Sequence, residues 1–186
     1  MSHLARSTFA DLDVVRAVLR RIAVDLGTIL GKDIALAEAR CERAHARPAG
    51  EGCIHISFKL AFRIDGADVF HGCLLVPLPE AIAWGGLLLM LPEDAIAARR
   101  EETTLDPDLK QALLEIGNVI AGAVHTALAE LGLPWRALSQ GCQGVRADVR
   151  PALPYVEGTE VLVGRVDASI GALPTARWLA ILPVPA

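Results

Sequence analysis

The chain has 186 residues, of which 53% are hydrophobic and 4% aromatic, and its net charge at pH 7 is −4. This length fits one domain with a substantial core, and the scarcity of aromatic residues means that Leu, Val, Ile and Ala must fill it. The acidic balance, with a pI near 5.7, excludes an extended basic surface for nucleic acid.

The sequence contains no segment that predicts a membrane span or secretion. The most apolar run, residues 81–91, is too short to cross a bilayer. Asp11 and Asp13 lie where a signal peptide needs its apolar segment. We therefore expect a cytoplasmic protein with no membrane partner, in which residues 1–186 form one domain and residues 1–11 a loose N-terminal segment.

The cysteines and histidines are dispersed along the chain. No C-x-x-C pair or zinc-ligand spacing occurs, and a disulfide framework is not expected in a cytoplasmic chain of this size. His55 and His71 fall on neighbouring predicted strands, and we interpret them as ordinary strand residues. The sequence therefore predicts no metal site.

Residues 12–31 predict an amphipathic helix, because apolar residues recur at helical spacing and Gly31 supplies a C-terminal stop. A short strand is expected at residues 34–41 and a loop at 47–52. Residues 54–64 alternate without a break, which predicts a strand with one covered face and one wetter face. The covered face holds Ile54, Ile56, Phe58, Leu60, Phe62 and Ile64, and the wetter face holds His55, Ser57, Lys59 and Arg63.

Asp65-Gly66 predicts a hairpin turn, with a return strand at residues 69–76. Helices are expected at residues 79–91 and 93–99, followed by a long helix at 109–133. The remaining strand candidates are residues 136–139, 144–150, 160–167 and 176–182, with turns at 151–158 and 170–174 between them.

The long helix at residues 109–133 separates into two faces at about 100° per residue. Its apolar arc contains Leu113, Ile116, Val119, Ile120, Ala123, Val124, Ala127 and Leu131. The opposite face carries a group that we call the polar stripe: Gln111, Glu115, Asn118, Gly122 and His125. Asp106 is the predicted N-cap, and Pro107 fits the first helical position.

Asn118, Gly117 and Gly122 are poor helix formers, and each glycine costs about 1 kcal/mol relative to Ala. A helix that keeps all three residues despite this cost is expected to gain a compensating contact or function at that face. Gly122 leaves a notch, one turn beyond Asn118, where a partner could approach closely. The alternative without a function is a helix packed tightly against a neighbour, with an incidental exposed Asn.

The string from Glu115 to Gly122, EIGNVIAG, resembles the E-x-x-N signature of the CheC/CheX/FliY phosphatases of bacterial chemotaxis. The resemblance extends over most of the chain, from the first helix to the last strand. It implies an α/β (α+β) fold, with helices on one face of a largely antiparallel sheet and an internal duplication of helix followed by strands.

The resemblance also implies a function. In this family a helix with Glu and Asn docks on a phosphorylated CheY-like receiver domain and hastens loss of its aspartyl phosphate. By resemblance, Asn118 orients the attacking water and Glu115 pairs with the active-site lysine of the receiver. Gln111, Gly122 and His125 are candidate partner-binding residues, although a solvent-facing His125 is the simpler interpretation. Mg²⁺ would be bound by the receiver, so no cofactor is predicted in this chain.

The duplication predicts one site. Aligning Leu30-Gly31 with Leu131-Gly132 places Val14 and Ala17 opposite Glu115 and Asn118, so the first helix lacks both polar residues, as in the single-site CheX type. Two positions depart from the family pattern. Gln111 stands where two-site members often have Asp or Ser, and Gly141 stands where a proline commonly follows the Asn by twenty-three residues.

Two other functions remain open from the sequence. The chain could be a catalytically silent CheC/CheX-like interaction module that binds a receiver or a motor protein. It could also be a stand-alone dimerising domain that extends its sheet between two copies. Single-site members tend to form homodimers, and we expect a homodimer here.

Overall fold

The structure is a computed structural model that describes residues 11–46, 48, 51–64, 69–154, 156 and 158–185. The predicted loose segment at residues 1–11 lies outside this part except for Asp11, which begins the first helix. In chain order the elements are α1 (Asp11–Leu30), β1 (Ile34–Leu36), β2 (Arg40–Ala44), β3 (His55–Arg63), β4 (Phe70–Pro77), α2 (Leu78–Leu88), α3 (Glu93–Arg99), α4 (Pro107–Glu130), β5 (Arg136–Val145), β6 (Val161–Ile170) and β7 (Ala176–Pro183).

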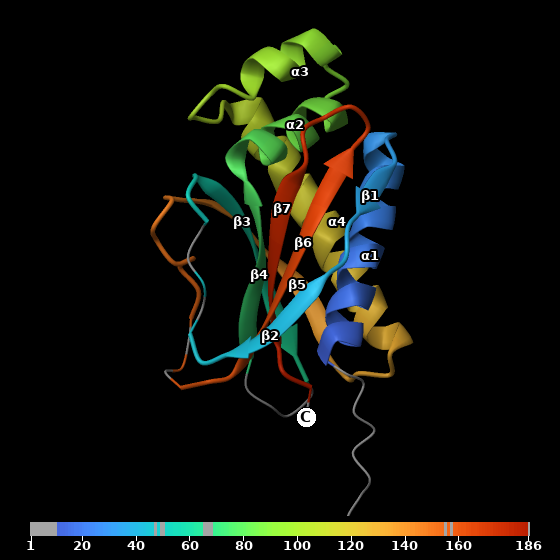
Figure 1. Cartoon of the computed structure of the whole chain (residues 1–186), viewed down its shortest axis with the longest axis vertical. Helices are drawn as coiled ribbons and strands as arrows, with labels where there is room; N and C mark the ends of the chain where they lie inside the picture. Colours follow the sequence, from blue (N-terminus) through green and yellow to red (C-terminus); the bar gives the residue numbers. More distant parts are fainter. Residues whose placement is uncertain are drawn as a thin grey trace, which may run out of the picture.

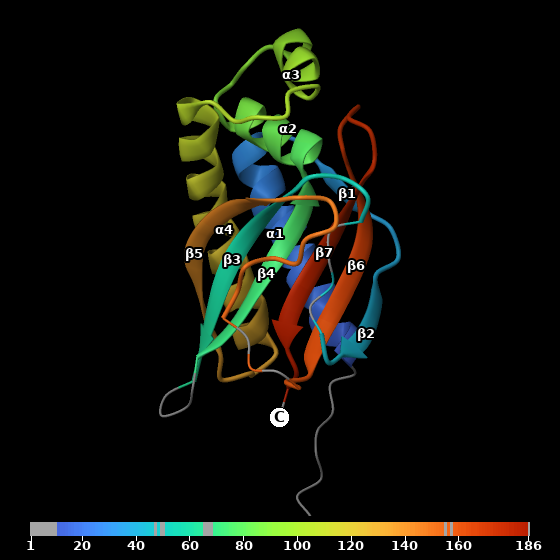
Figure 2. The ribbon, with the colours of Figure 1, turned by 90° about the vertical axis from the view of Figure 1, so that its left-hand side faces the viewer.

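One antiparallel sheet forms the centre of the fold, in the order β1-β6-β7-β4-β3-β5, with β2 also paired to β6. Helices α1 and α4 lie side by side on one face of this sheet (Figures 1 and 2). The main core lies between these helices and the sheet and is mostly aliphatic, as the composition predicts. The predicted α+β class is therefore confirmed.

The strand order also confirms the predicted duplication. In the first half, β1 and β2 correspond to β5 of the second half, β3 corresponds to β6, and β4 corresponds to β7. Exchanging each strand for its counterpart gives the same strand order, read from the other edge of the sheet. The two helices that begin the halves end in the same way: Gly31 has φ 63° and Gly132 has φ 69°. Lys32 N donates to Gly27 O at 3.1 Å and Leu133 N donates to Leu128 O at 2.9 Å, so the equivalent hydrogen bond closes both helices.

Part of the second face of the sheet is covered, which corrects the prediction for His55 and Ser57 of β3, whereas Lys59 is half-buried and Arg63 is exposed, as a wetter face requires. The connection from β5 to β6 crosses this face (Figure 2). His55 is 5% exposed and Ser57 1% exposed, although alternation placed both on the solvent side. A smaller apolar cluster lies here, formed by Cys73, Leu75, Val145, Leu153, Val161, Val163, Leu179 and Ile181.

Several element boundaries differ from those predicted. The strand expected at residues 34–41 is two short strands, β1 and β2. The candidates at 136–139 and 144–150 are one strand, β5, which ends at Val145, so the strand predicted at 144–150 is wrong. Beyond it, Val149 N donates to Arg146 O in a turn. Helix α2 ends at Leu88, three residues before its predicted end, and the hairpin turn at Asp65-Gly66 lies outside the described residues.

Helices α2 and α3 join the two halves of the chain. Two consecutive glycines in α2, Gly85 and Gly86, allow it to pack closely on its neighbours. A Cβ added at Gly85 would lie 2.8 Å from Leu109 Cδ2, and one added at Gly86 would lie 2.8 Å from Ile96 Cγ1. These glycines therefore let α2 approach α4 on one side and α3 on the other. Ile96 is the buried side chain of α3.

Glu80 is a buried carboxylate in this region, with 1% of its surface exposed. Trp84 Nε1 donates to its Oε1 at 3.1 Å, and Arg100 Nη1 lies 3.8 Å from its Oε2. Trp84 in turn stacks on Phe58 and meets Trp178 edge-on. Burial raises the pKa of Glu80, against the opposing effects of the Trp84 hydrogen bond and the Arg100 charge.

We expect Glu80 to make the stability of the protein fall as the pH rises. The folded chain holds the Glu80 proton more tightly than the unfolded chain, whose glutamate pKa is about 4.3. The contribution of Glu80 to the free energy of unfolding is therefore present below that pH and is lost as the pH rises through the raised pKa. Denaturant unfolding from pH 4 to 7 should show the wild type losing stability relative to Glu80→Gln. The exposed Glu102→Gln is the control, and a difference that is flat with pH would contradict the prediction.

Met90 occupies a position at the end of α2 where α1 and α4 have glycine. Its φ is 57°, and Leu91 N donates to Gly86 O at 2.9 Å in the pattern that closes α1 and α4. A side chain costs roughly 1–2 kcal/mol in this conformation, and Met90, 90% exposed, packs on little. Met90→Gly should raise the free energy of unfolding by about 0.5–1 kcal/mol, measured by urea denaturation. Met90→Ala removes the side chain but keeps Cβ, and an equal gain in that variant would contradict the explanation.

Candidate functional site

The candidate site lies on α4, and the local sequence explains how this helix begins. Asp106 accepts a hydrogen bond from Leu109 N at 2.8 Å, and Pro107 occupies the first turn. Both were predicted. The Leu109 hydrogen bond, supported by Arg99, lowers the pKa of Asp106, so the cap stays ionised.

Helix α4 packs against the sheet on one side, mainly β5, and against α1 on the other. By length and apolar composition it is the one helix in the described part of the chain that could cross a membrane, but more than half of its apolar stretch is buried inside the fold. Here it is a core helix. Most of the predicted apolar arc is buried, while Val119 and Leu131 are half-buried.

All five residues of the polar stripe, Gln111, Glu115, Asn118, Gly122 and His125, are exposed, as predicted. Residues three and four apart on a helix are neighbours, so the structure brings the stripe together on one surface. Gln111 Nε2 donates to Glu115 Oε1 at 3.2 Å, one turn away. This contact was not predicted, although the spacing of four residues is the signal for it.

The two glycines of α4 have different surroundings. A Cβ added at Gly122 would meet nothing within 4 Å, whereas one added at Gly117 would lie 3.5 Å from Phe58 Cδ1 and 3.5 Å from Ser139 Oγ. A Cβ would therefore fit at both positions, in ordinary van der Waals contact at Gly117 and in open space at Gly122, so tight packing against a neighbour requires neither glycine. The notch predicted at Gly122 is open to solvent.

An apolar side chain that was not singled out from the sequence borders the stripe. Leu114 is 40% exposed, and its Cδ2 would lie 3.8 Å from a Cβ added at Gly141. Gly141 has φ 79° and sits in a bulge of β5, where the pairing with β3 shifts between Phe58 and Leu60. Gly141 stands where the family that the sequence resembles commonly has proline. Here it is a bulge residue with a left-handed backbone conformation beside the candidate site, and a proline could not adopt this φ.

The equivalent face of α1 carries no such group. Val14 is buried and Ala17 is half-buried at the positions that align with Glu115 and Asn118. Within the described ranges, no group of three or more His, Cys, Asp or Glu side chains could hold a metal ion. The candidate site therefore consists of a carboxylate and two carboxamides on one face of α4, with the imidazole of His125 further along the helix, and these groups can donate and accept hydrogen bonds.

Comparison of the sequence with protein-family models gives no match, and comparison with the curated proteins gives none. Comparison of the structure with solved structures gives clear matches. FliY from Thermotoga maritima has a TM-score of 0.67 at 17% identity, covering 96% of this chain and 92% of that one. A FliG–FliM complex from H. pylori gives a TM-score of 0.65 at 10% identity, covering 98% and 96%.

The chemotaxis protein CheX from Desulfovibrio desulfuricans gives a TM-score of 0.55 at 15% identity, covering 90% of this chain and 97% of that one. These identities are too low to separate the CheX type from the others. The predicted resemblance is confirmed at the level of the whole fold: the chain has the architecture shared by CheX, CheC-like proteins, FliY and FliM.

Proposed function

We propose that this protein is a CheX-like phosphatase, which hydrolyses the aspartyl phosphate of a CheY-like receiver domain in bacterial chemotaxis or two-component signalling, in the cytoplasm. The observation that carries the proposal is the pair Glu115 and Asn118, exposed one turn apart on the core helix of a CheX-like fold. Their helix is held by the core along its whole length, so the pair is presented without a flexible loop.

The reaction needs little from the protein. An aspartyl phosphate is reactive, and a catalyst must chiefly hold a water in line with the phosphorus. The Asn118 carboxamide can bind that water through either its oxygen or its NH₂ group without a change of charge. Water attacks phosphorus, the bond to the aspartyl oxygen breaks, and the products are inorganic phosphate and the free carboxylate.

Glu115 gives the complex its orientation by pairing with the receiver lysine. The hydrogen bond from Gln111 occupies Oε1 and leaves Oε2 for that lysine. The receiver would bring its own Mg²⁺. Gly122 provides room for close approach, and His125 lies at the rim of the contact.

A second function is favoured by a different observation. One of the matching structures is a FliG–FliM complex, so a chain with this fold can occur in a complex with another protein. This chain would then be an interaction module that binds without hydrolysis.

A homodimer fits either function, because β5 is an edge strand that pairs with β3 alone. Light scattering at micromolar concentration tests the dimer, and a clean monomer would count against it.

The first functional prediction concerns Glu115 and Asn118. The decay of phosphorylated receiver domains from the same organism should be faster with this protein present. Asn118→Ala should abolish the acceleration while partner affinity is kept, because the water loses its ligand. Glu115→Ala should weaken both. The exposed Glu102→Ala, a carboxylate outside α4, is the matched control and should behave as the wild type.

Three other results have distinct meanings. Binding without any acceleration by the wild type would favour the interaction module. Full acceleration by Asn118→Ala would place the chemistry elsewhere. Absence of binding to every receiver would leave the fold without this function.

The second functional prediction uses the two glycines of α4. Gly122→Ala and Gly117→Ala should each raise the free energy of unfolding, by up to about 1 kcal/mol, through the better helix propensity of alanine. In the decay assay, Gly122→Ala should reduce the acceleration several-fold because its methyl group enters the contact surface, whereas Gly117→Ala should not. Equal acceleration by the two variants would remove Gly122 from the docking surface.

A further inference from the structure

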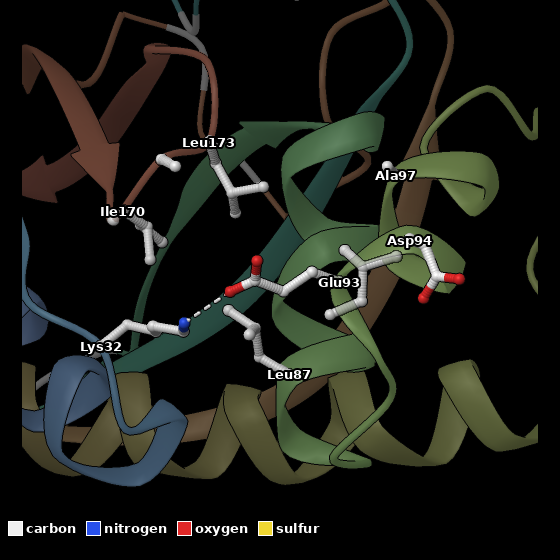
Figure 3. A pocket seen from close by; sticks show the side chains of 10 residues that line it. Lys32, Leu87, Glu93, Asp94, Ala97, Ile170 and Leu173 are labelled. Carbon is white, nitrogen blue, oxygen red and sulfur yellow. Dashed lines mark hydrogen bonds and ion pairs between the residues drawn. The ribbon is translucent and has the colours of Figure 1, made fainter.

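A hollow lies on the protein where the end of α1, the start of α3 and the turn between β6 and β7 come together (Figure 3). It encloses about 340 Å³, at the small end of the range for small-molecule sites. Its walls are mostly apolar, with Leu87, Ile96, Ile170 and Leu173 among them. No residue of α4 lines it, so the hollow is separate from the polar stripe.

One ion pair spans this apolar space. Lys32 Nζ and Glu93 Oε1 are 3.0 Å apart and point toward one another between Leu87 and Leu173 (Figure 3). The two partners are held differently: the side chain of Lys32 is 39% exposed and that of Glu93 is 83% exposed. Asp94 points away from the pair (Figure 3).

We propose that the hollow binds a small amphiphile with an apolar body and a carboxylate head, which pairs with Lys32 in place of Glu93. Glu93 is free to turn into water, and an exposed ion pair of this kind contributes little to stability, so its displacement by the ligand costs little. Each methylene that the ligand buries against the apolar walls favours binding through the hydrophobic effect. The ammonium of Lys32 keeps a counter-ion throughout.

The same geometry disfavours a cationic ligand. A cation bound in the hollow beside Glu93 would lie close to the ammonium of Lys32, and the two like charges would repel each other. A neutral alcohol could fill the space but would not replace the carboxylate at Lys32. The head group should therefore decide affinity.

Octanoate, octylamine and octanol are suitable probes because they share a chain and differ in the head group. Titration of the full chain, followed by amide NMR, should show saturable binding of octanoate, with shifts at Gly171 and Leu173. Octanol and octylamine should bind at least ten-fold more weakly. Equal binding of octanol, preference for octylamine, or no binding of any probe would overturn the proposal.

Variants test the head-group contact and the space separately. Lys32→Met keeps the aliphatic stem and should weaken octanoate at least ten-fold, whereas Lys110→Met, on the surface of α4, should not. Glu93→Gln should strengthen octanoate two- to five-fold because the competing carboxylate is gone. Unchanged affinity in Lys32→Met would overturn the role of its ammonium.

Ala97→Trp should fill the hollow and abolish binding, because Ala97 lines it. Ala98→Trp, on the next exposed position of α3, is the matched control and should bind octanoate normally. Thermal unfolding of both variants confirms that they are folded. Normal binding in a folded Ala97→Trp would show that octanoate binds elsewhere and would overturn the site.

Discussion

The fold depends on one constraint: α4 must be buried along one side of its whole length. Its buried face closes the core against α1 and the sheet, and each large aliphatic side chain in that position contributes roughly 1.5–3 kcal/mol. Rotation of the helix by one residue would expose part of this face. The same packing therefore fixes the direction of the polar stripe, and the positions of Glu115 and Asn118 are set by burial on the opposite side of the helix.

The two equivalent helices of the duplicated architecture differ in sequence, and the candidate site lies on α4 and not on α1. The halves share their strand order and their helix ends, with Gly31 and Gly132 in the same conformation. They differ where α1 presents Val14 and Ala17 in place of Glu115 and Asn118. Val14 is fully buried, so a carboxylate at that position would be removed from water, which is costly for an unpaired charge. A second site on α1 would therefore require more than two substitutions.

The sequence alone was enough to predict α1, α4 and the core face of β3, because their apolar spacing is regular over many residues. The stripe followed from the same periodicity. Strand β5 was harder, since its middle reads Ser-Gln-Gly-Cys-Gln-Gly and strand propensity is low there. Strand β5 forms because it pairs with β3 and accommodates a bulge at Gly141. Pairing between strands so far apart in the chain leaves no pattern in the local sequence that would predict it.

Glu80 shows a second limit of reading the sequence. Glu80 immediately precedes the apolar run at residues 81–91, yet the structure buries its carboxylate beside Trp84 and Arg100. Its partners are four and twenty residues away, and only the packing of α3 brings Arg100 back to it. His55 and Ser57 are buried for a similar reason. The chain beyond β5 covers the part of the sheet face on which they lie, whereas the alternation of the sequence alone places them in water.

Gln111 departs from the pattern of the family that the sequence resembles, and the structure suggests a physical role for it. It stands one turn before Glu115, and its amide donates to that carboxylate. An amide at this position restrains the Glu115 side chain without adding charge, which in the proposed function would reduce the rotamer entropy lost on docking. An aspartate at the same position would repel Glu115 across one turn. Gln111 is thus compatible with the proposed role of Glu115 as the partner of a receiver lysine, and it leaves Glu115 as the one carboxylate of the polar stripe.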